Sequence, residues 1–222
     1  MANFESAGYA IVPDVLSASE CAAIAKTLES LEACGPGSRR LLNAEWCRQL
    51  ATSLKRHARI MPHLPADAVA VQCTLFDKSP ERNWLVALHQ DLAIPVQERV
   101  DAAECSGWSL KEGVLFVQPP TEVLANLVAV RVHVDDCNAE NGPIRVVPGS
   151  HRQGRLSAAE AESLREERGE MVCTGPRGSV VLMRPLLLHA SSKAREASSR
   201  RVLHFLFGPA TLPFGLRWHE AV

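Results

Sequence analysis

From residue 67 onward, the sequence breaks into short runs of strand-forming residues separated by turn-forming residues. The clearest runs are AVAVQCTLF, LVAVRVHVDD, SVVLMR and RRVLHFLF, and intervening segments such as CNAENG and PGSHRQG are rich in Gly, Pro, Asn and Ser. Many short strands with turn signals between them are typical of a β-sandwich or barrel. The pattern predicts a mainly β fold over residues 67–208, with the jelly roll (double-stranded β-helix) as a leading option.

The first third of the chain has the periodicity of helices instead. The segment SASECAAIAKTLESLEACG opens with a capping-box pattern, Ser17 three residues before Glu20, and NAEWCRQLATSLKRHA offers a second amphipathic run. We expect these N-terminal helices to pack on the major sheet. A third helical segment, SAAEAESLREERGE, interrupts the β region and is predicted to be a surface helix.

Length and charge limit the domain number and the partners. The 222 residues, 46% hydrophobic and 22% charged, fit a single domain over residues 1–222, with a mainly helical part at 1–66 and the jelly-roll core at 67–208. The net charge is −1 and no basic stripe with interleaved aromatic residues occurs, so we expect no nucleic-acid partner. No apolar run approaches the ~18 residues of a membrane-spanning helix, so we expect no membrane partner.

The cysteines and the N-terminus predict a cytoplasmic protein. The seven cysteines are odd in number and form no CxxC pair, which argues against a disulfide framework or a zinc ribbon. The first residues, MANFESAGYAIVPDVL, lack the basic start and apolar stretch of a signal peptide. The oligomeric state cannot be read from these features.

Two strand-like runs end on histidine. His89 and Asp91 close NWLVALHQD, and alternation along a strand places both on one face. His189 closes the apolar run RPLLLHASS in the same way. Brought together, the three would form a two-histidine, one-carboxylate set that leaves three coordination positions open on a non-haem Fe(II). Spacing alone is equally compatible with buried histidines that hydrogen-bond near strand ends.

Several motifs in order resemble one family. HQD, the turn NGPIRVVPGSH, the spacing H-x10-R from His189 to Arg200, and the stretches GWSLKEG and RVHVDDCNAENGP are similar to the phytanoyl-CoA dioxygenase-like (PhyH) family of Fe(II)/2-oxoglutarate-dependent oxygenases. The resemblance covers about Gln72 to Phe207. It implies that His89, Asp91 and His189 bind the iron, and that Arg200 binds the distal carboxylate of 2-oxoglutarate.

The same resemblance implies the reaction. The family consumes Fe(II)-bound 2-oxoglutarate and O2, releases succinate and CO2, and oxidises a substrate. Related halogenases replace the iron-binding carboxylate with a small residue, so Asp91 favours hydroxylation. Because alternation turns only one of Arg200 and Arg201 inward, the family offset selects Arg200, whose planar guanidinium can hold a carboxylate through two parallel hydrogen bonds.

Further residues are candidates for cosubstrate or substrate contacts. The family places cosubstrate contacts near Gln72, Thr74, Lys78, Gln90 and Trp108, of which Lys78 is expected in a loop. Ordinary alternatives are a solvated strand face, a surface lysine and a packed tryptophan.

On the strand LVAVRVHVDD, alternation puts Arg131 and His133 on the inner face, and His204 shares the parity of Arg200. A buried arginine needs a partner, which would be an anionic substrate or an internal acid such as Asp135 or Asp136. The expected substrate is therefore a small molecule, anionic if Arg131 faces the pocket. No basic cluster marks a site for acyl-CoA phosphates.

Two other functions remain open at this point. A jelly-roll protein with a degenerate site would be a binding or scaffold protein without turnover. A cupin-like metalloenzyme would bind a metal without using 2-oxoglutarate, and it would not need Arg200. Iron binding without consumption of 2-oxoglutarate would favour either alternative.

Overall fold

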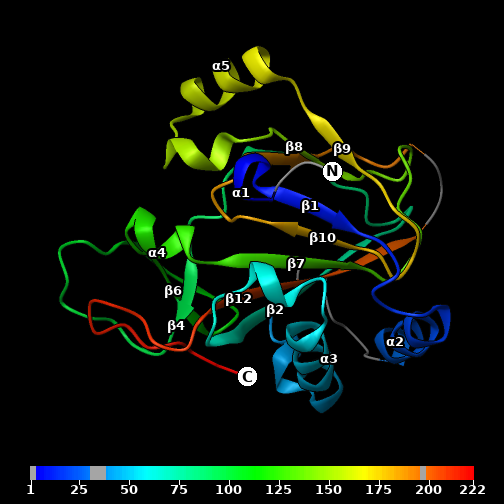
Figure 1. Ribbon diagram of the computed structural model, residues 1–222, viewed down its shortest axis with the longest axis horizontal. Coiled ribbons are helices and arrows are strands. Elements are labelled where there is room, and N and C mark those ends of the chain that lie inside the picture. The colour runs from blue at the N-terminus through cyan, green and yellow to red at the C-terminus, as the bar shows by residue number, and fades with distance from the viewer. Residues whose placement is uncertain (1–3, 31–38, 196–198) are drawn as a thin grey trace.

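The computed structural model describes residues 4–30, 39–195 and 199–222, and its centre is a five-stranded antiparallel sheet (Figure 1). The strand order is β1-β10-β7-β12-β2. The strands are β1 (Tyr9–Val12), β10 (Val180–Met183), β7 (Val128–His133), β12 (Arg200–Pro209) and β2 (Ala68–Lys78). The mainly β prediction is confirmed, but β1 is a strand within a region that was expected to be mainly helical.

A four-stranded antiparallel sheet faces the first one, in the order β3-β11-β8-β9. Its strands are β3 (Val86–His89), β11 (His189–Ser191), β8 (Ile144–Val146) and β9 (Met171–Cys173). Side chains from β7 and β10 pack against those of β8 and β9 in one apolar cluster that joins the two sheets. This cluster fills part of the space between the two sheets.

A third sheet, β4-β6-β5, flanks the sandwich. It contains β4 (Ile94–Val96), β6 (Val114–Gln118) and β5 (Ser106–Lys111), and the short helix α4 (Thr121–Ala125) follows it. Neither β4 nor β5 is predicted from the sequence. Both are short, and β5 is largely exposed, so neither has the apolar alternation of a half-buried strand.

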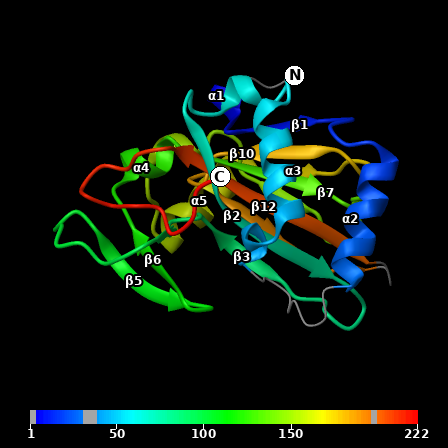
Figure 2. The same cartoon turned by 90° about the horizontal axis from the view of Figure 1, so that it is seen from below.

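Two helices cover the outer face of the five-stranded sheet, as predicted (Figure 2). They are α2 (Ala18–Ser30) and α3 (Glu45–Arg56), accompanied by α1 (Phe4–Ala7), η1 (Leu41–Asn43) and η2 (Met61–His63). The predicted capping box is present, because the Glu20 backbone N–H donates to Ser17 Oγ at 3.2 Å and the Ser17 N–H donates to Glu20 Oε2 at 2.7 Å.

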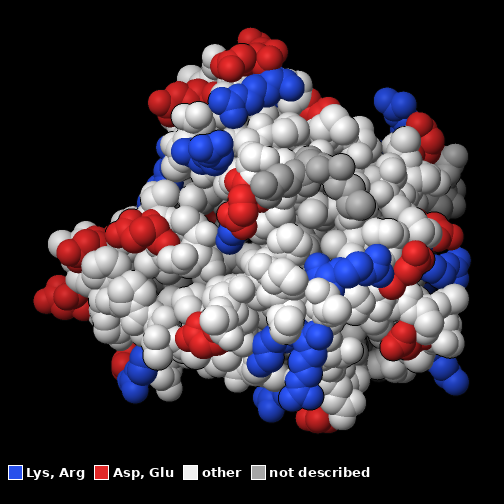
Figure 3. Space-filling model, in the orientation of Figure 1, with Lys and Arg blue, Asp and Glu red and all other residues white. Residues whose placement is uncertain are grey.

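Helix α5 (Ala158–Arg168) lies beyond the four-stranded sheet, after the short turn η3 (Ser150–Gln153). Its capping box joins Ser157 and Glu160. Among the described residues, no helix has both the length and the apolar character needed to cross a membrane. On the face drawn in Figure 3, basic and acidic side chains are interspersed.

The register of the five-stranded sheet determines which side chains face the space between the sheets. Arg200 pairs with Lys78, and His204 pairs with both Thr74 and Arg131. These residues alternate with apolar neighbours that face the helices. One side of the sheet is therefore apolar and the other carries polar and charged groups.

Candidate metal and cosubstrate site

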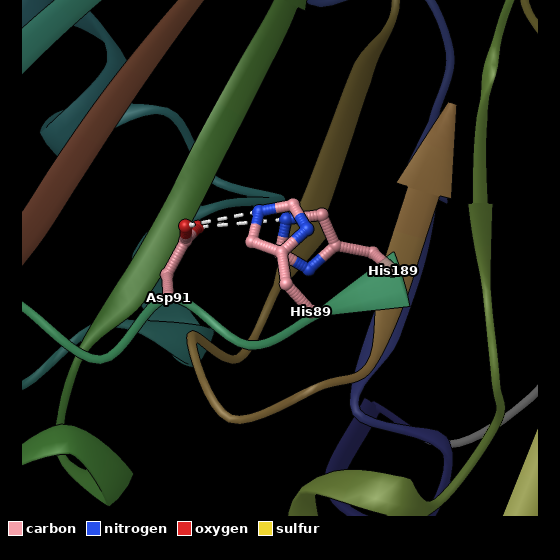
Figure 4. A group of neighbouring side chains, drawn as sticks. All are labelled: His89, Asp91 and His189. Atoms are coloured by element: carbon pink, nitrogen blue, oxygen red, sulfur yellow. Dashed lines mark ion pairs between the residues drawn. The ribbon is translucent and has the colours of Figure 1, made fainter. Parts of the chain in front are cut away.

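Two histidines and one carboxylate meet at the edge of the four-stranded sheet. His89 ends β3 and pairs directly with His189 at the start of β11, and Asp91 follows two residues after His89. Figure 4 shows Asp91 facing both imidazoles. His89 Nε2 lies 3.7 Å from Asp91 Oδ1, and His189 Nε2 lies 3.7 Å from Asp91 Oδ2. One ligand atom from each residue lies within 4.8 Å of the others, so a single ion could contact all three.

Backbone carbonyl groups orient both imidazoles. His89 Nδ1 donates to the carbonyl oxygen of Ala87 at 2.8 Å, and His189 Nδ1 donates to that of Leu187 at 2.9 Å. Since a carbonyl only accepts, each Nδ1 carries the proton and each Nε2 keeps its lone pair. Imidazoles that bind metals are commonly held in this way.

The protonation states also suit a divalent cation. Burial lowers the pKa of His189 to about 4, so this imidazole is neutral at pH 7. Burial raises the pKa of Asp91, but its attraction to His189, His204 and His89 outweighs that effect and lowers the pKa overall. A neutral imidazole and an ionised carboxylate are the forms that bind a metal.

A cavity of about 430 Å³ opens beside these three residues. Its wall includes the predicted residues Gln72, Thr74, Lys78, Gln90, Arg131, Arg200 and His204. Trp108 and His133 are absent from the wall. The two sheets therefore bring most of the predicted site residues to one cavity.

Arg200 and Lys78 form a buried cationic pair in this cavity, being 3% and 1% exposed. Arg200 Nε donates to the carbonyl oxygen of Asn141 at 3.1 Å, and Lys78 Nζ donates to Ser191 Oγ at 2.9 Å. Lys78 is the last residue of β2, so its expected place in a loop is wrong. Burial and then the charge of Arg200 lower the pKa of Lys78 to about 8.

Arg201 points the other way, as alternation predicts. Its Nε donates to Asp135 Oδ2 at 2.8 Å, and its Nη1 lies 3.0 Å from Glu29 Oε1 on α2. Arg200 is the arginine of the pair that faces the cavity. The neighbouring guanidinium instead ties β12 to the helical layer.

Arg131 and His204 form a second polar group in the cavity. Arg131 Nη1 donates to His204 Nδ1 at 2.7 Å, and its guanidinium carbon lies 5.1 Å from the centre of the Phe76 ring. The two acids considered as internal partners pair elsewhere, Asp135 with Arg201 and Asp136 with Arg177. Neither acid is therefore the partner of Arg131.

Gln90 lies in the cavity wall, and its side-chain amide group forms hydrogen bonds with backbone groups. Its Nε2 donates to the carbonyl oxygens of Gly154 and Leu186, each at 2.7 Å, and its Oε1 accepts the Leu156 N–H at 2.9 Å. These bonds connect β3 to the segments on either side. Gln90 thus helps to shape the wall.

Two predicted residues lie away from the cavity. Trp108 lies on β5 of the third sheet, where it packs at the edge of an apolar cluster and Arg99 lies 5.3 Å from its ring centre. His133 faces inward but lies farther along β7 than Arg131, and its Nδ1 is 3.0 Å from Ser179 Oγ. Both residues therefore pack within the fold and do not line the cavity.

The cavity wall also contains residues that were not predicted from the sequence, among them Phe76, Ser191, Trp84 and Lys111. Phe76 shares the parity of Gln72 and Thr74, so strand alternation could have found it. Trp84 and Lys111 reach the wall only through the arrangement of distant segments.

Comparison with known proteins identifies relatives of the whole chain. A family model described as phytanoyl-CoA dioxygenase (PhyH) matches residues 4–202. The epimerase SnoN, solved in complex with Fe3+, alpha-ketoglutarate and nogalamycin RO, is similar with a TM-score of 0.71 and 18% identity, over 96% of this chain and 85% of that one. No curated protein matches this chain.

Two further solved structures have the same fold. EctD from S. alaskensis in its apoform gives a TM-score of 0.70 at 20% identity, over 99% of this chain and 81% of that one. HygX from Streptomyces hygroscopicus with nickel and 2-oxoglutarate bound gives 0.66 at 18% identity, over 95% and 86%. These similarities confirm the predicted jelly-roll fold.

Proposed function

The chain belongs to the phytanoyl-CoA dioxygenase (PhyH) family, and on this premise we propose that it is an Fe(II)- and 2-oxoglutarate-dependent dioxygenase that hydroxylates a small molecule. The observation that carries the proposal is the meeting of His89, Asp91 and His189 within 4.8 Å. Two imidazoles and one carboxylate bind Fe(II) and leave positions for a cosubstrate and O2.

Bound Fe(II) would supply the oxidation chemistry, in which 2-oxoglutarate and O2 are converted to succinate and CO2 while the substrate is hydroxylated. Arg200 would hold the distal carboxylate of the cosubstrate through paired hydrogen bonds, with Lys78 beside it. A guanidinium and an ammonium that are buried without a carboxylate partner fit an anionic ligand. The family model and the neighbouring structures with bound alpha-ketoglutarate or 2-oxoglutarate support this assignment.

Two polar residues on β2 would complete the cosubstrate contacts. Gln72 Nε2 donates to Thr74 Oγ1 at 2.8 Å. With that oxygen acting as acceptor, the Thr74 hydroxyl hydrogen is free to donate into the cavity. We assign Thr74 a hydrogen bond to the cosubstrate and Gln72 the role of orienting it.

Hydroxylation is the outcome that the ligand set favours. Asp91 keeps the carboxylate, so no small residue makes room for a halide at the metal. SnoN has this fold and is an epimerase, so the substrate and its placement determine which product follows oxidation. We therefore base hydroxylation on Asp91 and not on the fold.

The test is an anaerobic titration of metal-free protein with Fe(II) and then 2-oxoglutarate, followed by visible absorption. We expect a weak charge-transfer band that requires both additions. The band should be lost in His189→Ala and retained in His219→Ala, which changes an exposed histidine near the C-terminus.

Other outcomes would support the two alternative functions. A folded wild-type protein that binds Fe(II) but gives no band with 2-oxoglutarate would support the cupin-like metalloenzyme. A folded protein that binds neither would support the binding or scaffold protein. Either result would refute the dioxygenase.

A further inference from the structure

The cavity contains a buried guanidinium, Arg131, that the proposed binding of iron and 2-oxoglutarate does not use. Arg131 lies in the middle of β7 and is 7% exposed. Its Nη1 donates to His204, and its buried Nε has no hydrogen-bond partner among the described residues. Leaving a buried donor of a charged group unpaired costs free energy, so such a group is retained where it has a function or a ligand.

His204 does not neutralise this charge. Arginine has only donors, so the 2.7 Å contact requires His204 Nδ1 to accept. Neutral His204 then carries its proton on Nε2, which lies 4.0 Å from Asp91 Oδ2. A protonated Nε2 cannot bind a metal, so His204 separates Arg131 from the metal ligands and is not a fourth ligand.

The charges around the cavity favour an additional anion. Among the described residues of the wall, Asp91 is the only carboxylate, whereas Lys78, Arg131 and Arg200 are buried cations. Fe(II) with Asp91 contributes one positive charge, 2-oxoglutarate contributes two negative charges, and the three cations contribute three positive charges. Two positive charges then remain unmatched. This count leaves out two other cations of the wall. Arg39 already pairs with Glu112 at 2.8 Å, and Lys111 is exposed, with its Nζ 5.0 Å from the centre of the Phe116 ring.

The surroundings of Arg131 suit a planar anion. The guanidinium lies over the Phe76 ring, and one of its edges is held by His204, so both its plane and its rotation are limited. A guanidinium held in this way presents its remaining donors in a fixed fork that matches a carboxylate. Orientation before binding lowers the entropy cost of holding a ligand.

We propose that Arg131, held by Phe76 and His204, binds a carboxylate of the substrate, so that the enzyme hydroxylates a small carboxylic acid. This inference rests on the proposed function and specifies the substrate of the same site. Only one imidazole separates Arg131 from Asp91, so the substrate carboxylate would be held near the metal. The carbon that is hydroxylated would therefore be close to that carboxylate in the substrate. A cavity of about 430 Å³ that also holds 2-oxoglutarate limits the acid to a small one.

The experiment uses protein loaded with Zn(II) and 2-oxoglutarate, which is diamagnetic and does not turn over. Butanoate, hexanoate and phenylacetate are each titrated beside the corresponding amide, which has a similar shape and no charge. NMR follows the arginine Nε–H signals, and the signal lost in Arg131→Lys identifies Arg131. We expect at least one acid to bind tenfold more tightly than its amide and to shift that signal.

Variants separate a specific contact from a general charge effect. Arg131→Met should remove the preference for acid over amide, and Arg131→Lys should retain part of it. Arg177→Met, which removes an exposed arginine paired with Asp136, should keep the full preference. Thermal unfolding of Arg131→Met checks its fold, which should be at least as stable because an unpaired buried charge is removed.

A second set of titrations asks whether the cosubstrate itself is the carboxylate that Arg131 binds. We expect Arg131→Met to change the dissociation constant of 2-oxoglutarate less than threefold and Arg200→Met to raise it at least thirtyfold. Equal losses in the two variants would assign Arg131 to the cosubstrate and overturn the inference. So would the absence of any acid preference in wild-type protein that binds 2-oxoglutarate. If 2-oxoglutarate does not bind at all, the proposed function fails together with the inference.

Discussion

The two faces of the five-stranded sheet use the same strands for opposite purposes. The outer face carries residues such as Val130, Leu203 and Phe205, which are fully buried beneath α2 and α3. The inner face carries Lys78, Arg131 and Arg200, which are also buried but charged. Because neighbouring residues on one strand belong to different faces, a shift of one residue would exchange the two sets.

The difference separates stability from binding. Each large apolar side chain buried on the outer face contributes about 1.5–3 kcal/mol, whereas a buried cation without a partner opposes folding. The buried charges of the inner face lower the stability of the fold, and the apolar packing of the outer face offsets this loss. Substitutions on the outer face should weaken folding, and substitutions on the inner face should weaken ligand binding.

The largest effect is expected on the outer face. Phe205→Ala should lower the free energy of unfolding by roughly 3–5 kcal/mol, because it leaves a cavity between β12 and the helices. Urea unfolding measures this loss. The affinity for 2-oxoglutarate should be unchanged under conditions where the variant is folded. A loss below about 1 kcal/mol would contradict the role assigned to this face.

Substitutions of Arg200 and Arg201, at adjacent positions of β12, compare the inner face of the sheet with the outer face. Arg200→Met should raise the dissociation constant of 2-oxoglutarate about 100-fold, equivalent to roughly 2.7 kcal/mol. Arg201→Met should leave that constant unchanged and lower the free energy of unfolding by about 1 kcal/mol, because Asp135 loses its partner. Calorimetric titration and urea unfolding of both variants measure the two effects. The comparison fails if Arg201→Met weakens 2-oxoglutarate binding as strongly.

Gly142 supports the inner face from the turn between β7 and β8. Its φ is +72°, and a Cβ there would lie 2.6 Å from the Ser192 carbonyl oxygen and 3.1 Å from Lys78 Nζ. Gly142→Ala should therefore lower stability by about 1–2 kcal/mol and displace Lys78, with about a tenfold loss in affinity for 2-oxoglutarate.

Gly169 provides the control for backbone strain. It has the same φ of +72°, but a Cβ there would have no atom within 4 Å. Gly169→Ala should lower stability through backbone strain alone and leave 2-oxoglutarate binding unchanged. Equal affinities in the two variants would show that Gly142 matters only for the turn.

The last expected effect is a dependence on pH. Burial and the charges of Arg200, Arg131 and Arg145 lower the pKa of Lys78 to about 8, so its positive charge is lost as pH rises through 8. The affinity for 2-oxoglutarate should fall over that range. Without ligand the sign is opposite: the unfolded chain keeps this proton up to about 10.5, so stability should rise between pH 8 and 10.5. Both trends should flatten in Lys78→Met, and an unchanged slope would assign them to other groups.

Much of the site could be predicted because strand alternation is a local property. It required Arg200 and Arg201 to point to opposite faces, with the family offset selecting Arg200 as the inward one, and it put Gln72 and Thr74 on one face of β2. The predicted capping box at Ser17 follows from short-range hydrogen bonds in the same way. That residues 1–222 form a single domain stays a prediction.

The errors have physical causes that lie outside any single segment. Lys78 was expected in a loop, but pairing with Arg200 extends β2 through that residue. Trp108 and His133 have residue types that suit a site, yet the third sheet and the far end of β7 hold them away from the cavity. The partners of Asp135 and Asp136 likewise depend on how distant elements pack.

Residue order alone indicated which side chains share a face and predicted the helices α2, α3 and α5, and the family resemblance implied that His89, Asp91 and His189 bind one metal ion. Residue order could not show that β3 pairs with β11, because their histidines are about a hundred residues apart in the chain. Nor could it show that Arg131 contacts His204 instead of an acid. The physical reason is that side-chain direction repeats every two residues along a strand, whereas a cavity requires contacts between strands far apart in the chain.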